Sequence, residues 1–132
     1  MTKPSHRSIQ FITALFSSLA ASFALADFAG EWDQAEALKR MQSSDVVVID
    51  VRSPGEFAEG HVPGAINIPH NQIDEHAATL AELKGKDLLI YCRSGRRAGM
   101  AESELTEMGF SNLYHLKGDM QGWKAANPKI KK

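Results

Sequence analysis

The pattern of hydrophobic and polar positions after residue 26 predicts strands that alternate with helices. Two runs of mainly β-branched and aliphatic residues, Asp45–Val51 and Asp87–Tyr91, lack the alternation of a half-exposed strand. Such runs are typical of strands buried on both faces of a parallel sheet. Shorter strands are predicted at Ala65–Ile68 and Asn112–Leu116. The pattern therefore predicts an α/β fold with a mainly parallel central sheet flanked by helices on both faces.

Helices are predicted between these strands, from the spacing of their apolar residues. The longer segments with helical spacing are Trp32–Met41, Asn71–Leu83, Arg97–Met108 and Met120–Ala126. A short helix is also predicted after Ser53, which can cap it, with Pro54 at its first position. Cys92 follows the second buried strand directly. Because sites in such sheets lie at the carboxyl ends of the strands, Cys92 is a candidate site residue.

The first 26 residues have a different pattern. A short basic start precedes an acid-free apolar stretch, Ile9–Ala26, which ends in the small-x-small sequence Ala24-Leu25-Ala26 before the first acidic residue, Asp27. This pattern predicts a cleaved signal peptide over residues 1–26 and a single domain over residues 27–132. The alternative is an uncleaved anchor, because the stretch approaches the ~18–20 residues of a spanning helix. The bacterial style of the leader predicts a periplasmic protein that leaves the membrane after cleavage.

Charge and cysteine content narrow the possible functions. Removal of the leader, which contains Lys3 and Arg7 but no acid, changes the formal net charge from -1 to -3. Neither value predicts binding to nucleic acid or to an acidic membrane surface, so anion binding requires a local cluster. The chain has one cysteine, so no intramolecular disulfide can form. A lone thiol in an oxidising compartment is expected to be either buried or used.

The segment that begins at Cys92 has the residue types of a reactive thiol site. A strand ends, a short loop with Gly95 follows, and a helix begins. Backbone N–H groups in such a loop converge as an anion-binding nest, and the helix N-terminus adds partial positive charge. Three arginines lie within five residues of the cysteine: Arg93, Arg96 and Arg97. These features favour the thiolate. The alternative is a buried structural cysteine before a helix with solvated arginines.

Three motifs, in this order, resemble those of the rhodanese domain. Asp50–Phe57 followed by Gly60–Pro69 resembles the opening signature of that family. Tyr91–Ala98 looks like its active-site loop, and Gly118–Trp123 resembles its closing glycine–tryptophan segment. The similarity extends from about Phe28 to Trp123, nearly all of the chain after the leader. It implies a rhodanese-like fold and the activity of a thiosulfate sulfurtransferase.

The resemblance also implies roles for single residues. Cys92 would be the nucleophile that forms a persulfide, and the backbone amides of the loop after it would hold the sulfur. The implied substrate-binding residues are Arg93, Ser94, Gly95, Arg96 and Arg97. Asp50 and Arg52 match supporting residues near the loop, where they mainly organise the structure. His61 is interpreted as a turn-stabilising residue, and Trp123 as a core residue.

The implied reaction is nucleophilic catalysis at the thiolate. The thiolate attacks the outer sulfur of thiosulfate or a similar donor, sulfite or a thiol leaves, and a persulfide remains. Cyanide or a thiol, or a protein acceptor, then takes the sulfur. The sequence has no metal-ligand spacing, and the reaction is expected to need no metal or organic cofactor.

Other classes of protein also use a cysteine in a basic loop. A phosphatase of similar fold needs an arginine at the sixth position after the cysteine, where this chain has Ala98, and Arg97 lies one residue too early. A persulfide carrier or thiol-sensing module that acts with a partner protein uses the same chemistry and stays open as an alternative. A thiol–disulfide oxidoreductase is disfavoured because the chain has no resolving cysteine.

Overall fold

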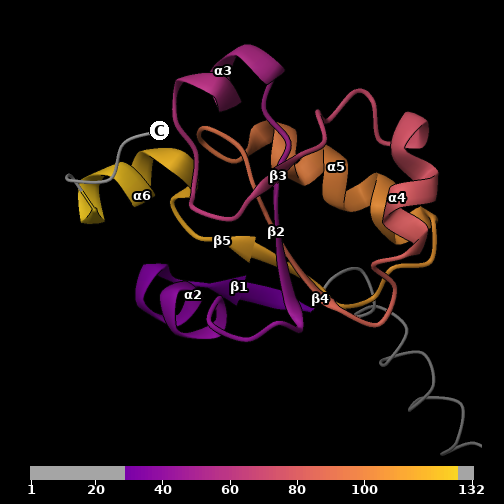
Figure 1. The fold of residues 1–132 in the computed structure, drawn as a ribbon, viewed down its shortest axis with the longest axis horizontal. Helices are drawn as coiled ribbons and strands as arrows, with labels where there is room; N and C mark the ends of the chain where they lie inside the picture. Colours follow the sequence, from indigo (N-terminus) through magenta and orange to yellow (C-terminus); the bar gives the residue numbers. More distant parts are fainter. Residues whose placement is uncertain (1–28, 128–132) are drawn as a thin grey trace, which may run out of the picture.

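The computed structural model describes residues 29–127, in which a parallel sheet of five strands forms the centre of the domain (Figure 1). Its strands are β1 (Gly30–Trp32), β2 (Val46–Asp50), β3 (Ile66–Asn67), β4 (Asp87–Tyr91) and β5 (Leu113–Leu116). Their order across the sheet is β1-β5-β4-β2-β3, and every neighbouring pair is parallel. The predicted parallel sheet is confirmed. The predicted leader and its cleavage point lie outside the described residues.

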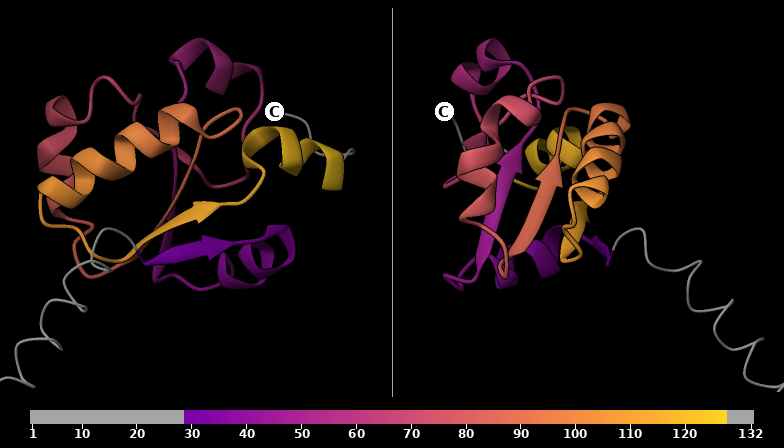
Figure 2. Two further views of the ribbon diagram at one scale, coloured as in Figure 1. Left: turned by 180° about the vertical axis from the view of Figure 1, so that it is seen from behind. Right: turned by 90° about the vertical axis from the view of Figure 1, so that its right-hand side faces the viewer.

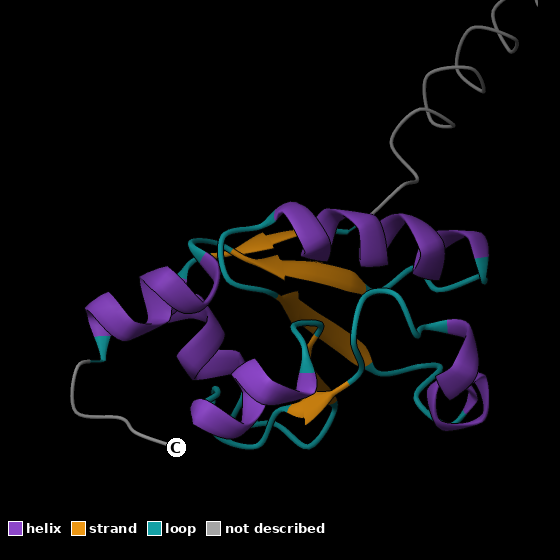
Figure 3. Cartoon of the chain, turned by 90° about the horizontal axis from the view of Figure 1, so that it is seen from above, coloured by secondary structure: helices purple, strands orange, loops and turns teal. Residues whose placement is uncertain are grey.

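All helices except α6, which follows the last strand, connect successive strands, and the helices form a layer on each face of the sheet (Figure 2). The elements are α2 (Gln34–Arg40), α3 (Pro54–Glu59), the 3₁₀ helix η2 (Asp74–His76), α4 (Ala77–Ala81), α5 (Arg96–Glu107) and α6 (Asp119–Ala126). Helices α4 and α5 lie over one face, and α2 and α6 over the other (Figure 3). Within residues 29–127, no helix has the length and hydrophobicity needed to cross a bilayer.

The central strand β4 contributes side chains to two separate hydrophobic cores. Leu88 and Ile90 pack in the core under α4 and α5, whereas Leu89 and Tyr91 pack in the core under α2 and α6. All four are fully buried. Successive strand side chains point to opposite faces, so burial on both faces requires the continuous hydrophobic run seen in the sequence. Burial of each such aliphatic side chain contributes about 1.5–3 kcal/mol.

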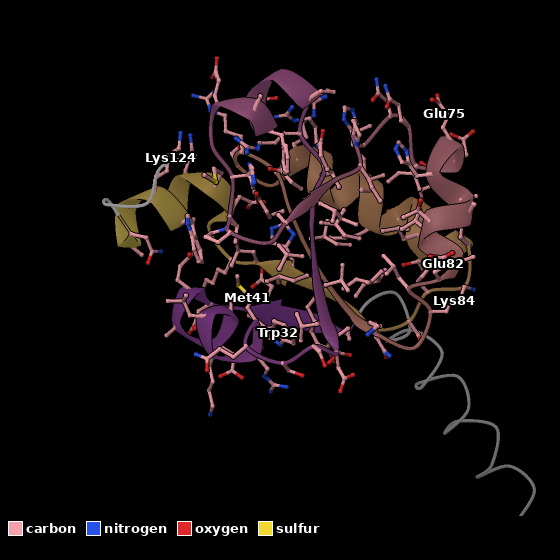
Figure 4. All side chains as sticks on the ribbon, in the orientation of Figure 1. Trp32, Met41, Glu75, Glu82, Lys84 and Lys124 are labelled. Atoms are coloured by element: carbon pink, nitrogen blue, oxygen red, sulfur yellow. The ribbon has the colours of Figure 1, made fainter. Side chains whose placement is uncertain are left out.

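The N-terminal edge of the domain differs from the prediction. Trp32 was expected to begin a helix, but it ends β1, which pairs in parallel with β5. The Trp32 ring stacks on Tyr114 of β5 at 4.3 Å between centroids and packs with Met41 in the core (Figure 4). Asp33 then caps α2 by accepting a backbone N–H. Three residues are too few to show a strand pattern, so the pairing with β5 decides this element.

The short helix α3 begins as predicted. The Ser53 hydroxyl accepts the backbone N–H of Glu56 at 3.2 Å, and the Glu56 carboxylate accepts the N–H of Ser53 at 3.2 Å. Together these bonds form a capping box, with Pro54 at the first helical position. The cap fixes the start of α3 and thereby the position of Glu56 in its first turn.

The helix predicted over Asn71–Leu83 is shorter and divided in two. A 3₁₀ turn over Asp74–His76 precedes a single α-helical turn over Ala77–Ala81. At His76 the backbone leaves helical geometry, with φ −107 and ψ 23, and the ring Nδ1–H donates to the carbonyl of Gln72 at 3.0 Å. The pattern of apolar residues alone indicates one helix because it carries no information about such local bonds.

Candidate active site

Cys92 lies directly after β4 and begins the loop that leads into α5 (Figure 1). Its side chain is buried, with a residue exposure of 1%. The sulfur Sγ accepts backbone N–H groups from Gly95 at 3.0 Å and from Ala98 at 3.3 Å. The loop therefore curls around the sulfur, and two N–H dipoles from the loop and the first turn of α5 point at it. In the sequence, Ala98 ends the motif Tyr91–Ala98 and occupies the position where a phosphatase has arginine, but it was not predicted to contact the sulfur through its backbone.

Gly95 allows the loop to turn back onto the sulfur. Its φ is +116, a conformation that side chains with a Cβ rarely adopt. A Cβ at this position would lie 3.2 Å from Oδ2 of Asp119. Both the backbone conformation and the close approach of Asp119 therefore require glycine here. The predicted importance of Gly95 is explained by its backbone, which donates an N–H to the sulfur.

The start of α6 holds the Cys92 loop from the other side. The Cys92 N–H donates to Oδ1 of Asp119 at 3.0 Å, and the Cys92 carbonyl accepts the N–H of Met120 at 2.9 Å. The N–H of Gln121 donates to the carbonyl of Arg93 at 3.2 Å. Asp119 was not predicted as a site residue. It lies in the closing motif of the sequence, but its contact with Cys92 spans 27 residues and becomes visible only in the fold.

The three loop arginines have different environments. Arg97 makes two hydrogen bonds with the Glu56 carboxylate, at 2.7 and 3.0 Å. This pairing raises the pKa of Arg97 and lowers that of Glu56 to about 2. Arg93 and Arg96 are exposed, and within residues 29–127 neither forms an ion pair. Of the predicted anion-binding cluster, Arg93 and Arg96 thus keep an unpaired charge, whereas Arg97 joins the loop to α3.

A cavity of about 320 Å³ lies beside the loop, between α3 and α6. Its lining residues are Arg52, Glu56, Glu59, Gly60, Arg93, Met120, Gln121 and Lys124. Three of them are basic and two are acidic. Arg93 connects the cavity to the loop that contains Cys92, and Lys124 extends from α6 (Figure 4). The cavity therefore offers a small anion both positive charge and a place beside the cysteine loop.

Asp50 and Arg52 form a buried pair at the end of β2. Two nitrogens of the Arg52 guanidinium donate to the Asp50 carboxylate at 2.7–3.1 Å, and Nη2 also donates to the carbonyl of Gly60 at 2.7 Å. The Tyr91 hydroxyl donates to Asp50 at 2.6 Å and accepts the N–H of Val62 at 3.0 Å. Burial and the bond to Asp50 raise the pKa of Tyr91. These contacts join β2, β4 and the turn after α3.

His61 and Trp123 make packing and backbone contacts, whereas Ser94 is exposed. The His61 ring Nδ1–H donates to the carbonyl of Phe57 at 2.8 Å, and the two rings stack at 3.7 Å. Trp123 is buried, with an exposure of 1%. The Ser94 side chain is exposed and makes no hydrogen bond within residues 29–127. The same residues contain no group of three or more His, Cys, Asp or Glu side chains placed to bind a metal ion.

Comparison with known proteins identifies the family. Residues 33–126 match the family model described as Rhodanese-like domain. The chain is 39% identical to thiosulfate sulfurtransferase PspE of Escherichia coli strain K12 over 83 residues, which cover 63% of this chain and 77% of that protein. It is 32% identical to thiosulfate:glutathione sulfurtransferase of Saccharomyces cerevisiae over 102 residues, covering 67% and 73%. This chain belongs to the rhodanese-like sulfurtransferase family.

Solved structures agree with this assignment. A rhodanese-related protein from Thermoplasma volcanium superposes with a TM-score of 0.65 and 26% sequence identity, covering 74% of this chain and 93% of that chain. The fold predicted from the order of strands and helices is therefore that of known rhodanese-like proteins.

Proposed function

We propose that this protein is a thiosulfate sulfurtransferase that carries the transferred sulfur as a persulfide on Cys92. The observation that supports this most directly is the pair of N–H groups, from Gly95 and Ala98, that point at the buried Sγ atom. Converging N–H dipoles stabilise negative charge on a thiolate sulfur, and equally on a persulfide. The names of the E. coli and yeast relatives support thiosulfate as the donor.

In the first half-reaction, the Cys92 thiolate attacks the outer sulfur of thiosulfate. A new S–S bond forms at Cys92, the S–S bond of thiosulfate breaks, and sulfite leaves with the electron pair of that bond. The product is a Cys92 persulfide with one negative charge, so charge and atoms balance. Arg93 borders the adjacent cavity and is placed to attract the dianionic donor. Ser94, Arg96 and the paired Arg97 belong to the same loop, and the exposed Arg96 adds a second positive charge near Cys92.

In the second half-reaction, a nucleophile takes the outer sulfur and the Cys92 thiolate is restored. Cyanide gives thiocyanate, and a thiolate gives its own persulfide. The name of the yeast relative supports a thiol such as glutathione as an acceptor. The cavity between α3 and α6 is where an acceptor would approach the loop.

Export to the periplasm is a further part of the proposal. Its support is the leader pattern of residues 1–26, which end in Ala24-Leu25-Ala26. The full chain should be expressed in a bacterial host and the mass of the purified protein measured. A protein that begins at Asp27 and is recovered from the periplasm supports export. A protein that retains the leader in the membrane fraction contradicts cleavage.

The activity is tested by comparing the wild-type protein with Cys92→Ser in thiosulfate:cyanide sulfurtransfer. Because Cys92 is the sole cysteine, the variant has no thiol, and mass spectrometry can assign an added sulfur without ambiguity. We expect the wild-type protein to turn over and to gain one sulfur after incubation with thiosulfate. The variant should do neither.

The remaining outcomes separate the proposal from its alternatives. Addition of one sulfur without turnover would identify a persulfide carrier that needs a protein acceptor. Absence of both from freshly reduced wild-type protein would refute the catalytic role of Cys92. Hydrolysis of an aryl phosphate that Cys92→Ser abolishes would instead indicate a phosphatase.

A further inference from the structure

A chain of charged side chains, of which Asp119 is buried and His115 and Glu102 are partly buried, lies behind the Cys92 loop. Asp119 uses both carboxylate oxygens: Oδ1 accepts the Cys92 N–H at 3.0 Å, and Oδ2 lies 3.0 Å from Nε2 of His115. The other ring nitrogen of His115, Nδ1, lies 2.6 Å from Oε2 of Glu102. The chain thus joins three elements, α5, β5 and the start of α6, to the backbone of Cys92.

The geometry defines the protonation state of His115. When both carboxyl groups are ionised, their oxygens can only accept hydrogen bonds, so both ring nitrogens donate and the ring is an imidazolium. Hydrogen bonds from Asp119 and Glu102 outweigh the opposing effect of burial and raise the pKa of His115 to about 10. The side chains are 13%, 4% and 12% exposed for His115, Asp119 and Glu102, so water competes weakly with these bonds.

Asp119 has a backbone conformation that is unfavourable for a residue with a side chain. Its φ is +56, and among the described non-glycine residues it is the one with a positive φ. Side chains with a Cβ are disfavoured in this left-handed region, which glycine adopts freely. The preceding residue, Gly118, also has a positive φ of +91. Glycine would adopt this backbone conformation more easily, yet the chain has an aspartate here, and its carboxylate contacts the Cys92 backbone.

We propose that Asp119 is a positioning residue for sulfur transfer and that His115 and Glu102 hold it in place. Bound from behind through its N–H, the Cys92 backbone is fixed so that Sγ faces the N–H groups of Gly95 and Ala98. The proposal rests on the proposed function of Cys92. Asp119 acts through Cys92 and does not touch the donor.

Two further contacts support this role. Oδ2 of Asp119 lies beneath Gly95, close enough that a Cβ there would approach it to 3.2 Å, so the carboxylate also supports the turn of the loop. The N–H of Cys92 is occupied by Asp119, which leaves the transferred sulfur to the amides of Gly95 and Ala98. The imidazolium offsets the charge of Asp119, the carboxylate that contacts the Cys92 backbone, and the remaining net negative charge lies on Glu102 at the far end of the chain.

The decisive variant is Asp119→Gly, made in the full chain. Glycine suits the positive φ at this position, which offsets part of the stability lost when the Cys92 N–H and His115 lose the carboxylate, so we expect the variant to fold with a lowered melting temperature. Loss of the carboxylate should lower kcat for thiosulfate by about 10- to 100-fold, because small misplacements of a nucleophile have effects of that size. KM should change less than threefold, since the cavity residues are unchanged.

Asp119→Asn separates the two contacts of the carboxylate. The asparagine oxygen can still accept the Cys92 N–H, so this variant should keep more of kcat than Asp119→Gly. Its amide cannot pair with an imidazolium, so the ring ¹⁵N signals of His115 should show loss of the ring proton at a lower pH than in the wild-type protein. Glu107→Gln, an exposed residue at the end of the same helix as Glu102, is the matched control and should change neither quantity.

The outcomes distinguish this inference from the proposed function. If Asp119→Gly transfers sulfur at the wild-type rate, the positioning role is refuted while the role of Cys92 stands. If the wild-type protein forms no persulfide, the proposed function itself fails. Should Asp119→Gly not fold, Asp119→Asn and His115→Gln decide: a wild-type kcat in both overturns the inference, and a reduced kcat with unchanged KM in folded protein supports it.

Discussion

Arg97 and Glu56 form a two-bond ion pair that joins the cysteine loop to α3. Nη1 and Nη2 of Arg97 lie 2.7 and 3.0 Å from the two carboxylate oxygens of Glu56, although the residues are 41 positions apart. Glu56 also belongs to the capping box with Ser53, so its carboxylate is held by both elements. An arginine expected to bind the donor therefore connects the first turn of α5 to the segment after β2.

The ion pair predicts a dependence of stability on acid. Arg97 lowers the folded-state pKa of Glu56 from 4.5 to about 2, so its stabilising effect is complete above about pH 4.5 and is lost as the pH falls toward 2. We expect Glu56→Gln to reduce the free energy of unfolding at pH 7 by up to about 1 kcal/mol, because the pair is partly exposed. The difference from the wild-type protein should shrink between pH 4.5 and pH 2 in urea titrations. Glu59→Gln in the same helix is the control, and an equal effect there would contradict the assignment.

The conformation of Gly95 predicts the effect of adding one methyl group. Gly95→Ala combines an unfavourable φ of +116 with a Cβ 3.2 Å from Asp119, so it should destabilise the protein by more than about 1 kcal/mol and slow persulfide formation. Gly99→Ala is the matched control, since Gly99 lies within α5 with open space around its Cβ position. That change should stabilise the helix by about 0.5–1 kcal/mol. Chemical denaturation of both variants tests the pair, and equal stability of the two would show that the loop does not need glycine.

Removal of the Tyr91 hydroxyl should lower stability without preventing persulfide formation. Tyr91→Phe removes the donor to Asp50 and leaves the N–H of Val62 without its acceptor, which should cost about 1–3 kcal/mol of unfolding free energy. Persulfide formation should persist, because Tyr91 and Cys92 pack in different cores on opposite faces of the sheet. Tyr114→Phe, which keeps its ring stacked on Trp32, is the control. Loss of persulfide formation in folded Tyr91→Phe protein would contradict this separation.

His115 predicts a loss of stability at alkaline pH. Its folded-state pKa of about 10 is higher than the ordinary value of 6.5, so its contribution is complete below about pH 6.5 and is lost as the pH rises through 10. The free energy of unfolding of the wild-type protein should therefore fall between pH 6.5 and pH 10, and this fall should be smaller in His115→Gln. Urea titrations at intervals across this range measure both slopes. Parallel slopes would show that His115 is not protonated in the folded state.

Much of the fold could be predicted because its central strands have a strong local signal. The runs that form β2 and β4 are apolar on both faces, and the capping box at Ser53 is a local pattern of residues. The strand β1 was missed because its three residues have no pattern of their own and are extended only by pairing with β5. Local hydrogen bonding at His76 likewise divided a helix that the apolar spacing made continuous.

By itself, the sequence determined the α/β class, the family and the position of Cys92 at the end of a buried strand, since each follows from residues close together in the chain. The tertiary structure alone decided which groups surround that cysteine. Asp119 reaches it from 27 residues away, and Glu56 takes the charge of Arg97 from 41 residues away. His115 is charged because β5 places it between two carboxylates from other elements. Contacts and protonation states of this kind depend on the packing of distant elements, which no local pattern specifies.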